Sequence, residues 1–376
     1  MLALGLRERG VEVEVHEQAR ELREIGAAVA LSANGVRELE RLGLGPQLAA
    51  LSTEPSALSI RRWDDGSSIV RAEMGARYRE TFGAPYYGIH RAPLLELLAA
   101  AVGSEHVVLG HRCVGVEQDA GRAELRFENG DQAAADVVVG ADGVHSVVRR
   151  AIAGERPPVF SGTVGYRGLV PRGDLPSLPD AMALQFWPGP RRHLLHYSID
   201  GGEIVNFLAV VRVEAWTAEG WMEPCPVRDV IDAFAGWHPA VTEMVGATAE
   251  GARWALHDHD PLERWHAGRV VVLGDAAHAM VPHQGQGANQ TIEDAATLAE
   301  CLAGASAADP GQALEAFVAL RRERTARVQA ASRRTADLLH VADEAQLGER
   351  DARFADPYRD LAWIHGHDVR VAASAH

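Results

Sequence analysis

Residues 269–302 read RVVVLGDAAHAMVPHQGQGANQTIEDAATLAECL, and this stretch decides the fold. The apolar, β-branched run at its start predicts a buried strand that ends in Gly274-Asp275. A loop rich in Pro and Gly follows, and a helix is predicted to begin at Asn289. In open α/β folds ligands bind at the carboxyl edge of the sheet, where such a strand delivers Asp275. The helix that follows directs the positive end of its dipole at the same place.

The same stretch supplies three components of a ligand site. Asp275 offers a carboxylate for hydroxyl groups, and Gly285 and Gly287 allow backbone amides to approach a flat ligand. The helix adds partial positive charge. A purely structural strand, loop and helix would explain each feature singly but explains their combination poorly. The stretch therefore predicts a ligand site.

Residues 273–302 resemble the flavin-ribityl motif of the FAD-dependent aromatic hydroxylases, the family of salicylate and hydroxybenzoate monooxygenases. The resemblance implies that Asp275, which follows Gly274, binds the ribityl chain of FAD. It also implies that the loop frames the isoalloxazine ring, through Pro282, Gly285, Gly287, Ala288 and Asn289.

Length and composition are those of a soluble globular enzyme. A chain of 376 residues can bury two interleaved lobes. The net charge of −15 argues against nucleic acid as the main partner. The three cysteines form no CxxC pair, which suits a reducing cytoplasm, and no segment has the pattern of a membrane span or a signal peptide. We expect a cytoplasmic monomer or homodimer without a membrane partner.

The start of the chain departs from the family pattern. MLALGLRERG predicts a helix that ends at Gly10, and VEVEVHE predicts a strand that ends in Glu17. These are the second half of a dinucleotide-binding βαβ unit, in which the acid takes the adenosine ribose hydroxyls. The G-x-G-x-x-G expected roughly 20 residues before that acid is not in the sequence. Either the chain is N-terminally trimmed, or it is a variant with impaired FAD affinity; the intact later motifs favour trimming.

Two further segments carry predicted cofactor contacts near the start of the chain. After the ribose acid, Gly26 and Ala27 are small where the backbone would approach the ring, and Arg23 reaches either a phosphate, the flavin or solvent. Arg91 stands at the start of an apolar helix within residues 89–102, where a basic side chain opposes the dipole. In the family this Arg contacts the cofactor.

Residues 135–152, ADVVVGADGVHSVVRRAI, resemble the family's GADGxxSxVR motif. The resemblance associates the motif with the FAD pyrophosphate region and with transit of the nicotinamide cofactor. Asp142 is predicted to accept from ribose or a bridging water, Gly143 to allow a sharp turn, and Arg149 to lie near phosphates. Because the sequence holds no second Gly-rich nucleotide fold, NADH or NADPH is expected to visit a groove on this lobe.

The middle of the chain predicts an antiparallel sheet that covers a planar aromatic substrate. His193 and His196 fall on opposite faces of one strand, so only one can face the substrate. Family members that hydroxylate phenols often use a His of this sheet to take the phenolic proton, and His196 is the first candidate, with His193 as the alternative. Gln286 is the third catalytic candidate. Substrate contacts are expected from Arg167, Arg192 and Tyr197.

A metal site is not expected. Residues 257–260 read HDHD, but adjacent residues of an extended segment point to alternating sides. This pattern does not converge on one ion.

The predicted architecture is α/β, with a Rossmann-like FAD-binding domain interleaved with an antiparallel-sheet substrate domain, followed by C-terminal helices. The FAD-binding domain is expected over 1–75, 90–160 and 255–340, the substrate domain over 76–89 and 161–254, and a helical tail over 341–376.

The resemblance implies an FAD-dependent monooxygenase that uses NADH or NADPH and O₂. It would hydroxylate a phenolic aromatic acid of the salicylate or hydroxybenzoate type through a flavin C4a-hydroperoxide. Two alternatives stay open: a tailoring hydroxylase or epoxidase for a larger polycyclic substrate, and an FAD-poor remnant without enzymatic activity.

Overall fold

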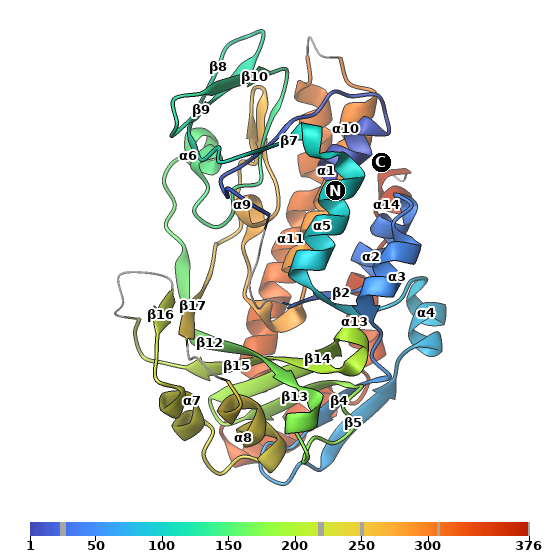
Figure 1. Cartoon of the computed structure of the whole chain (residues 1–376), viewed down its shortest axis with the longest axis vertical. Helices are drawn as coiled ribbons and strands as arrows, with labels where there is room; N and C mark the ends of the chain where they lie inside the picture. The colour runs from blue at the N-terminus through green and yellow to red at the C-terminus, as the bar shows by residue number, and fades with distance from the viewer. Residues whose placement is uncertain (23–27, 217–221, 249–251, 307–308, 375–376) are drawn as a thin grey trace.

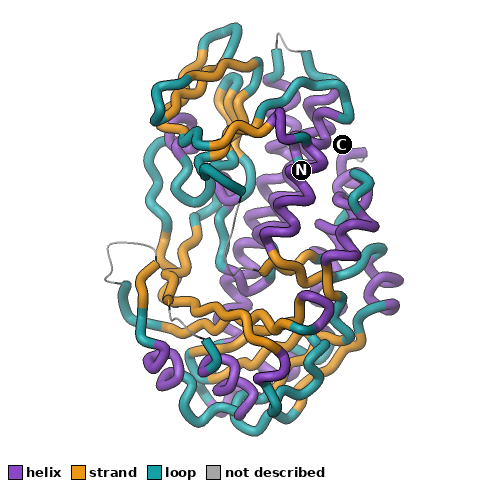
Figure 2. The backbone as a smooth tube through the Cα atoms, viewed as in Figure 1, coloured by secondary structure: helices purple, strands orange, loops and turns teal. Residues whose placement is uncertain are grey.

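The computed structural model describes residues 1–376 apart from 23–27, 217–221, 249–251, 307–308 and 375–376. A large sheet lies at one end of the molecule, and a helix-rich lobe with four small sheets lies at the other (Figure 2). Arg23, Gly26 and Ala27, expected near the cofactor, fall outside the described residues.

The large sheet has eight strands and is antiparallel except for one pair. In order across the sheet they are β16 (Met222–Pro224), β17 (Ala252–Asp258), β12 (Val159–Pro171), β15 (Ile204–Arg212), β14 (Arg192–Ile199), β13 (Leu184–Gly189), β4 (Ala57–Arg61) and β5 (Ser68–Glu73). The predicted antiparallel substrate sheet is thus present. One correction concerns β4 and β5: the sequence analysis assigned 1–75 to the FAD-binding domain, whereas β4 pairs in parallel with β13.

The two faces of this sheet are buried against different layers. On β14, Leu194 packs with Trp187 and Phe234 in a core beneath α7 (Val227–Ala233) and α8 (Pro239–Gly246), which we call the outer face (Figure 1). Leu195 and Tyr197, which alternate with Leu194, point to the opposite, inner face and pack toward the helical lobe.

Two long helices connect the lobe to the inner face. The first is α10 (Gly287–Ala303), and the second is α11 (Gly311–Leu339), whose last turn reaches the large sheet (Figure 1). Three helices follow along the chain: α12 (Leu347–Arg353), α13 (Pro357–His365) and α14 (Val369–Ser374).

The small sheets of the lobe carry the predicted ligand motifs at their ends. Two of them contain parallel pairs: β1 (Val15–Glu17) with β7 (Val107–Leu109), and β11 (Val138–Gly140) with β19 (Val270–Val272), which also pairs with β18 (His266–Ala267). The other two are antiparallel and comprise β2 (Ala28–Leu31), β6 (Tyr87–His90) and β3 (Ser52–Thr53), and β10 (Gln132–Ala135), β9 (Ala123–Phe127) and β8 (Cys113–Gln118).

The remaining helices are α1 (Leu2–Arg7), α2 (Ala33–Arg41), α3 (Gly45–Leu51), α4 (Ala76–Phe82), α5 (Arg91–Val102), α6 (Val147–Ala153) and α9 (Asp275–His278). Within the described part of the chain, none of the helices combines the length and the apolar character needed to cross a membrane.

Candidate active site

Asp275 stands at the carboxyl end of a fully buried strand. The three valines of β19 are buried, whereas the Asp275 side chain is exposed. Gly274 turns the chain with φ 60°, and a Cβ there would come within 2.9 Å of Thr291 Oγ1 on α10. A Cβ on Gly287, at the start of α10, would lie 3.9 Å from Asp275 Oδ1. The carboxylate therefore lies beside the N-terminus of a 17-residue helix, as the sequence predicted.

The loop of residues 282–287, which we call the glycine loop, is pinned to the lobe by one side chain. Asn289 Nδ2 donates to Gly285 O at 2.8 Å and to Ala30 O at 3.0 Å, while its Oδ1 accepts from Ser32 N at 3.0 Å. Gly285 takes φ 62°, a left-handed conformation that favours glycine. Asn289 thus ties the loop to β2 and to the residue that follows it.

Gln286 is buried beneath the same loop. Its Nε2 donates to Ser32 Oγ at 2.9 Å, and its Oε1 accepts from Asn34 and Gln290, each at 3.1 Å. Gln286 is the third catalytic candidate, and it lies at the start of α10, where its amide takes part in a buried hydrogen-bond network. Its catalytic role stays a prediction.

Buried charges join α10 to α11 below this network. Arg321 Nε donates to Asp294 Oδ1 at 2.7 Å, and Arg324 Nε donates to Glu293 Oε2 at 2.7 Å. Burial raises the pKa of Glu293, but the charges of Arg321 and Arg324 outweigh it and hold this pKa below its ordinary value. Both carboxylates are fully buried, so α10 and α11 are held together by compensated charge.

The alternation of β14 separates the two catalytic histidine candidates. His196 shares the outer face with Leu194 and is fully buried, and neither ring nitrogen has a partner in the described residues. Burial, together with the charge of Arg61, lowers the pKa of His196 to about 3. The first catalytic candidate thus lies on the face away from the glycine loop. The register of β14 decides this, and alternation alone cannot show which face is inner.

His193 lies on the inner face, where two histidines that the sequence analysis did not select surround it. The Nδ1 of His193 is 2.7 Å from the Nε2 of His340, which follows α11. The rings of His193 and His283, a residue of the glycine loop, have centroids 5.1 Å apart. One nitrogen from each of the three rings falls within 4.8 Å of the others. We call these three residues the histidine cluster.

The histidine cluster is uncharged near neutral pH. Burial lowers the pKa of His193 well below its ordinary value. Burial and the charge of Arg212 lower the pKa of His283 to about 4, and burial is also the main reason that the pKa of His340 falls to about 3. An uncharged imidazole can accept a proton.

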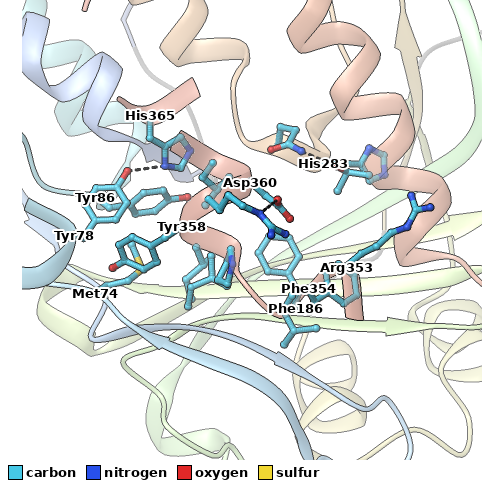
Figure 3. A pocket seen from close by; sticks show the side chains of 18 of the residues that line it. Met74, Tyr78, Tyr86, Phe186, His283, Arg353, Phe354, Tyr358, Asp360 and His365 are labelled. Atoms are coloured by element: carbon cyan, nitrogen blue, oxygen red, sulfur yellow. Dashed lines mark hydrogen bonds and ion pairs between the residues drawn. The ribbon is translucent and has the colours of Figure 1, made fainter. Parts of the chain in front are cut away.

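A cavity of about 490 Å³ lies between the inner face, the glycine loop and the C-terminal helices. Figure 3 shows His283 at one end of it and Tyr78, Tyr86 and His365 at the other. Tyr78 Oη is 2.8 Å from His365 Nδ1. Further lining side chains are mainly apolar: Leu58, Ile60, Leu184, Phe186, Leu338 and Phe354. Such a cavity suits a small organic ligand with few polar contacts.

Residues 1–335 match the family model described as "FAD binding domain". The chain belongs to this family. It is 42% identical over 368 residues to 3-amino-4-hydroxybenzoate 2-monooxygenase of Streptomyces cremeus, covering 97% of this chain and 91% of that protein. It is 34% identical over 403 residues to salicylate hydroxylase of Pseudomonas putida, covering 98% and 90%. A solved "Salicylate hydroxylase substrate complex" has a TM-score of 0.86 at 29% identity, covering 99% of this chain and 94% of that chain.

The family confirms the predicted fold class and the predicted chemistry. The chain is an FAD-dependent monooxygenase, with NADH or NADPH as reductant. Its own residues fit the flavin: Asp275 presents an exposed carboxylate, Asn289 holds the glycine loop through Gly285 O, and the start of α10 lies next to Asp275. Pro282 begins the short 3₁₀ turn of this loop, and Ala288 is in the first turn of α10.

The residues expected at the adenosine and phosphate end have different surroundings. Glu17 ends β1, and its Oε1 accepts from Ala19 N at 2.8 Å. Asp142 caps α6 by accepting from Val147 N at 2.7 Å and Val148 N at 3.1 Å, and Gly143 has φ 75°. Asp142 therefore binds the first two amides of α6, beside the N-cap residue Ser146.

Two arginines expected near the cofactor differ in exposure. Arg91 begins α5 and is exposed, so its predicted contact with the cofactor stays a prediction. Arg149 is buried and donates to Ala276 O at 3.1 Å and to Val144 O at 2.8 Å. These hydrogen bonds join Arg149 to α9 and to the loop before α6. Its place near the phosphates stays a prediction.

The predicted substrate residues also divide between the faces. Arg167 and Tyr197 are on the inner face, and Arg167 lies over the Trp254 ring, 5.2 Å from its centroid. Arg192 follows the alternation of Leu194 and lies on the outer face, so the geometry does not bring it to the glycine loop.

The HDHD segment is used for internal contacts. Asp258 and Asp260 both pair with Arg333 of α11, and His259 Nε2 lies 2.9 Å from Val144 O. Of the histidines that sequence reasoning missed, His283 lay inside the quoted glycine motif and could have been selected there. His340 carries no local signal, because only the tertiary fold brings the end of α11 to β14.

Proposed function

We propose that this chain hydroxylates the ring of a phenolic aromatic acid, with O₂ as the source of the oxygen atom. The observation that carries the proposal is the histidine cluster beside the glycine loop, in which His193 and His340 are hydrogen-bonded. Relatives named for 3-amino-4-hydroxybenzoate and for salicylate support this substrate class, because both compounds are hydroxylated benzoates. Three free cysteines support a reducing, cytoplasmic location.

In this reaction His193 takes the phenolic proton. Its Nδ1 is engaged by His340, which leaves Nε2 for the substrate, and His283 forms the neighbouring wall. When the phenol O–H bond breaks and an N–H bond forms at His193, the ring becomes a more electron-rich phenolate. Positioned general bases of this kind contribute about 10²- to 10⁴-fold to a rate.

The acid group of the substrate is assigned to Arg167. Arg167 and His193 lie on the same face of the sheet, two strands apart, so their backbones are separated by about 10 Å across the strands. A guanidinium can bind a carboxylate through two parallel hydrogen bonds. The aromatic ring then lies over the partly exposed Leu195 and Leu208 between these two side chains.

FAD, when bound, accepts two electrons from NADH or NADPH and supports transfer of one oxygen atom of O₂ to the ring. The chain contributes Asp275 and the glycine loop to hold and orient the flavin. The apolar side chains that line the cavity beside His283 limit the access of water to this end of the site.

The test uses the protein loaded with FAD and a panel of acids: 3-amino-4-hydroxybenzoate, salicylate and 3-hydroxybenzoate. We expect at least one to accelerate NAD(P)H oxidation and to yield a product that carries one ¹⁸O atom from ¹⁸O₂. The proposal is wrong if none of these acids is hydroxylated. Because a cavity of about 490 Å³ also admits larger ligands, a hydroxynaphthoate belongs in the panel, and hydroxylation of that compound alone favours a polycyclic substrate.

A further inference from the structure

The backbone N–H and the backbone C=O of His340 each make a hydrogen bond. Its N–H donates to Asp337 O at 3.2 Å, which caps the end of α11, and its C=O accepts from Arg191 N at 3.2 Å in the turn between β13 and β14. Its side chain is only 5% exposed. The backbone therefore holds this imidazole in one place, between the helix and the strand that carries His193.

The contact between His340 and His193 is a directed hydrogen bond. Only 2.7 Å separate Nε2 of His340 from Nδ1 of His193, and both rings are buried. One of the two nitrogens must carry the hydrogen, so the bond selects the tautomer of each ring. If Nδ1 of His193 carries it, the Nε2 atom of His193 is left unprotonated and can act as a base.

The surroundings of the pair contain no buried carboxylate that could stabilise a protonated imidazole, as far as the described residues extend. The charge of Arg212 of β15, which pairs with the exposed Asp337 of α11, acts on His340, and His283 approaches from the glycine loop. Arg191 reaches His340 through its backbone N–H. A proton taken by His193 must therefore be stabilised mainly by imidazole acceptors.

We propose that His340 is a positioning residue that makes His193 an effective base, an inference that rests on the function proposed above. When the phenolic proton moves to Nε2 of His193, the Nδ1–H of the resulting imidazolium donates to the neutral Nε2 of His340. One O–H bond breaks, one N–H bond forms, and no electrons are exchanged. Without His340, a buried N–H would carry positive charge with no acceptor.

The first experiment replaces His340 in the FAD-loaded protein. We expect His340→Leu to lower kcat about 10- to 100-fold with little change in KM, and His340→Gln, whose side-chain oxygen can accept from His193, to recover part of the loss. His106→Gln, at a partly exposed position outside the histidine cluster, serves as the control for replacing a histidine. If His340→Leu and His340→Gln both keep the full kcat, the proposal is wrong.

A double-mutant cycle shows whether His340 acts through His193. In the background of His193→Asn, adding His340→Leu should cause almost no further loss of kcat, because the base is already missing. An equal loss in both backgrounds would assign His340 an independent or merely structural role and would overturn the proposal.

The third readout does not depend on turnover. The ultraviolet spectrum of a phenolic acid bound to the oxidised protein, without NAD(P)H, reports whether it is bound as the phenol or as the phenolate. We expect its ionisation midpoint to move up by about 1 to 2 pH units in His340→Leu, matching the 10- to 100-fold loss. An unchanged midpoint contradicts the proposal. If the unsubstituted protein hydroxylates no phenolic acid, the proposed function is wrong. If it does and the His340 variants behave like it, only the proposed role of His340 is wrong.

Discussion

Asp275 is the residue whose charge we expect to bind the ribityl chain of the flavin. Its carboxylate is exposed beside the start of α10, so Asp275→Asn removes the charge while keeping the shape. We expect FAD affinity to fall by roughly 10- to 100-fold, the amount typical for a hydrogen bond to a charged group. Fluorescence titration of apoprotein with FAD measures it. Asp232→Asn, on α7 beneath the outer face, is the control, and equal affinities of the two variants would contradict the assignment.

The two buried histidines of β14 form a matched pair for testing the catalytic base. His193→Asn should lower kcat about 10²- to 10⁴-fold, because it removes the proton acceptor beside the glycine loop. His196→Asn changes the outer face, and we expect it to reduce stability while leaving kcat near that of the unsubstituted protein. Steady-state kinetics of the two folded variants gives both kcat values. A larger loss of kcat in His196→Asn than in His193→Asn would restore His196 as the base.

At the scale of elements, the buried charges between α10 and α11 predict that replacing two different glutamates of α10 will lower the free energy of unfolding by very different amounts. Glu293→Gln leaves Arg324 without its buried carboxylate and Arg321 with Asp294 alone, which should cost about 3 to 5 kcal/mol of the free energy of unfolding. Glu300→Gln, on the exposed side of α10, should cost about 1 kcal/mol or less. Urea unfolding measures both, and similar losses would show that the network is not stabilising.

The elements also show what a sequence can and cannot predict. The strand and loop around Asp275 were predictable, because β-branched residues, Gly and Pro act locally, although α10 begins at Gly287 and not at Asn289. The placement of β4 in the large sheet was not, because hydrogen bonding between strands far apart in the chain leaves no local pattern. For the same reason, only the fold shows that the side of β14 that carries His193 faces the glycine loop.

For the whole molecule, the buried histidines predict that acid destabilises the protein before its carboxylates titrate. Burial lowers the pKa of His283 to about 4, whereas the unfolded chain binds that proton near pH 6.5. Between these values the unfolded state holds more protons than the native state, so the free energy of unfolding falls as pH falls from 6.5 to about 4.

Urea unfolding at about pH 7, 6 and 5 measures this slope, and His283→Gln should reduce it by up to about one proton. His106→Gln, at a partly exposed position outside the histidine cluster, is the matched control. A pH-independent free energy of unfolding in the unsubstituted protein would contradict the expectation.

Helix α11 contacts both the helical lobe and the large sheet, and it therefore links the two parts of the molecule. Near its middle it carries Arg321 and Arg324, which pair with carboxylates of α10, and it ends next to His340, which is hydrogen-bonded to His193 on the sheet. At about 1.5 Å per residue, its 29 residues make a rod roughly 43 Å long. Because this one helix contacts both α10 and the large sheet, inserting or deleting a turn of it would change the spacing between the glycine loop and β14.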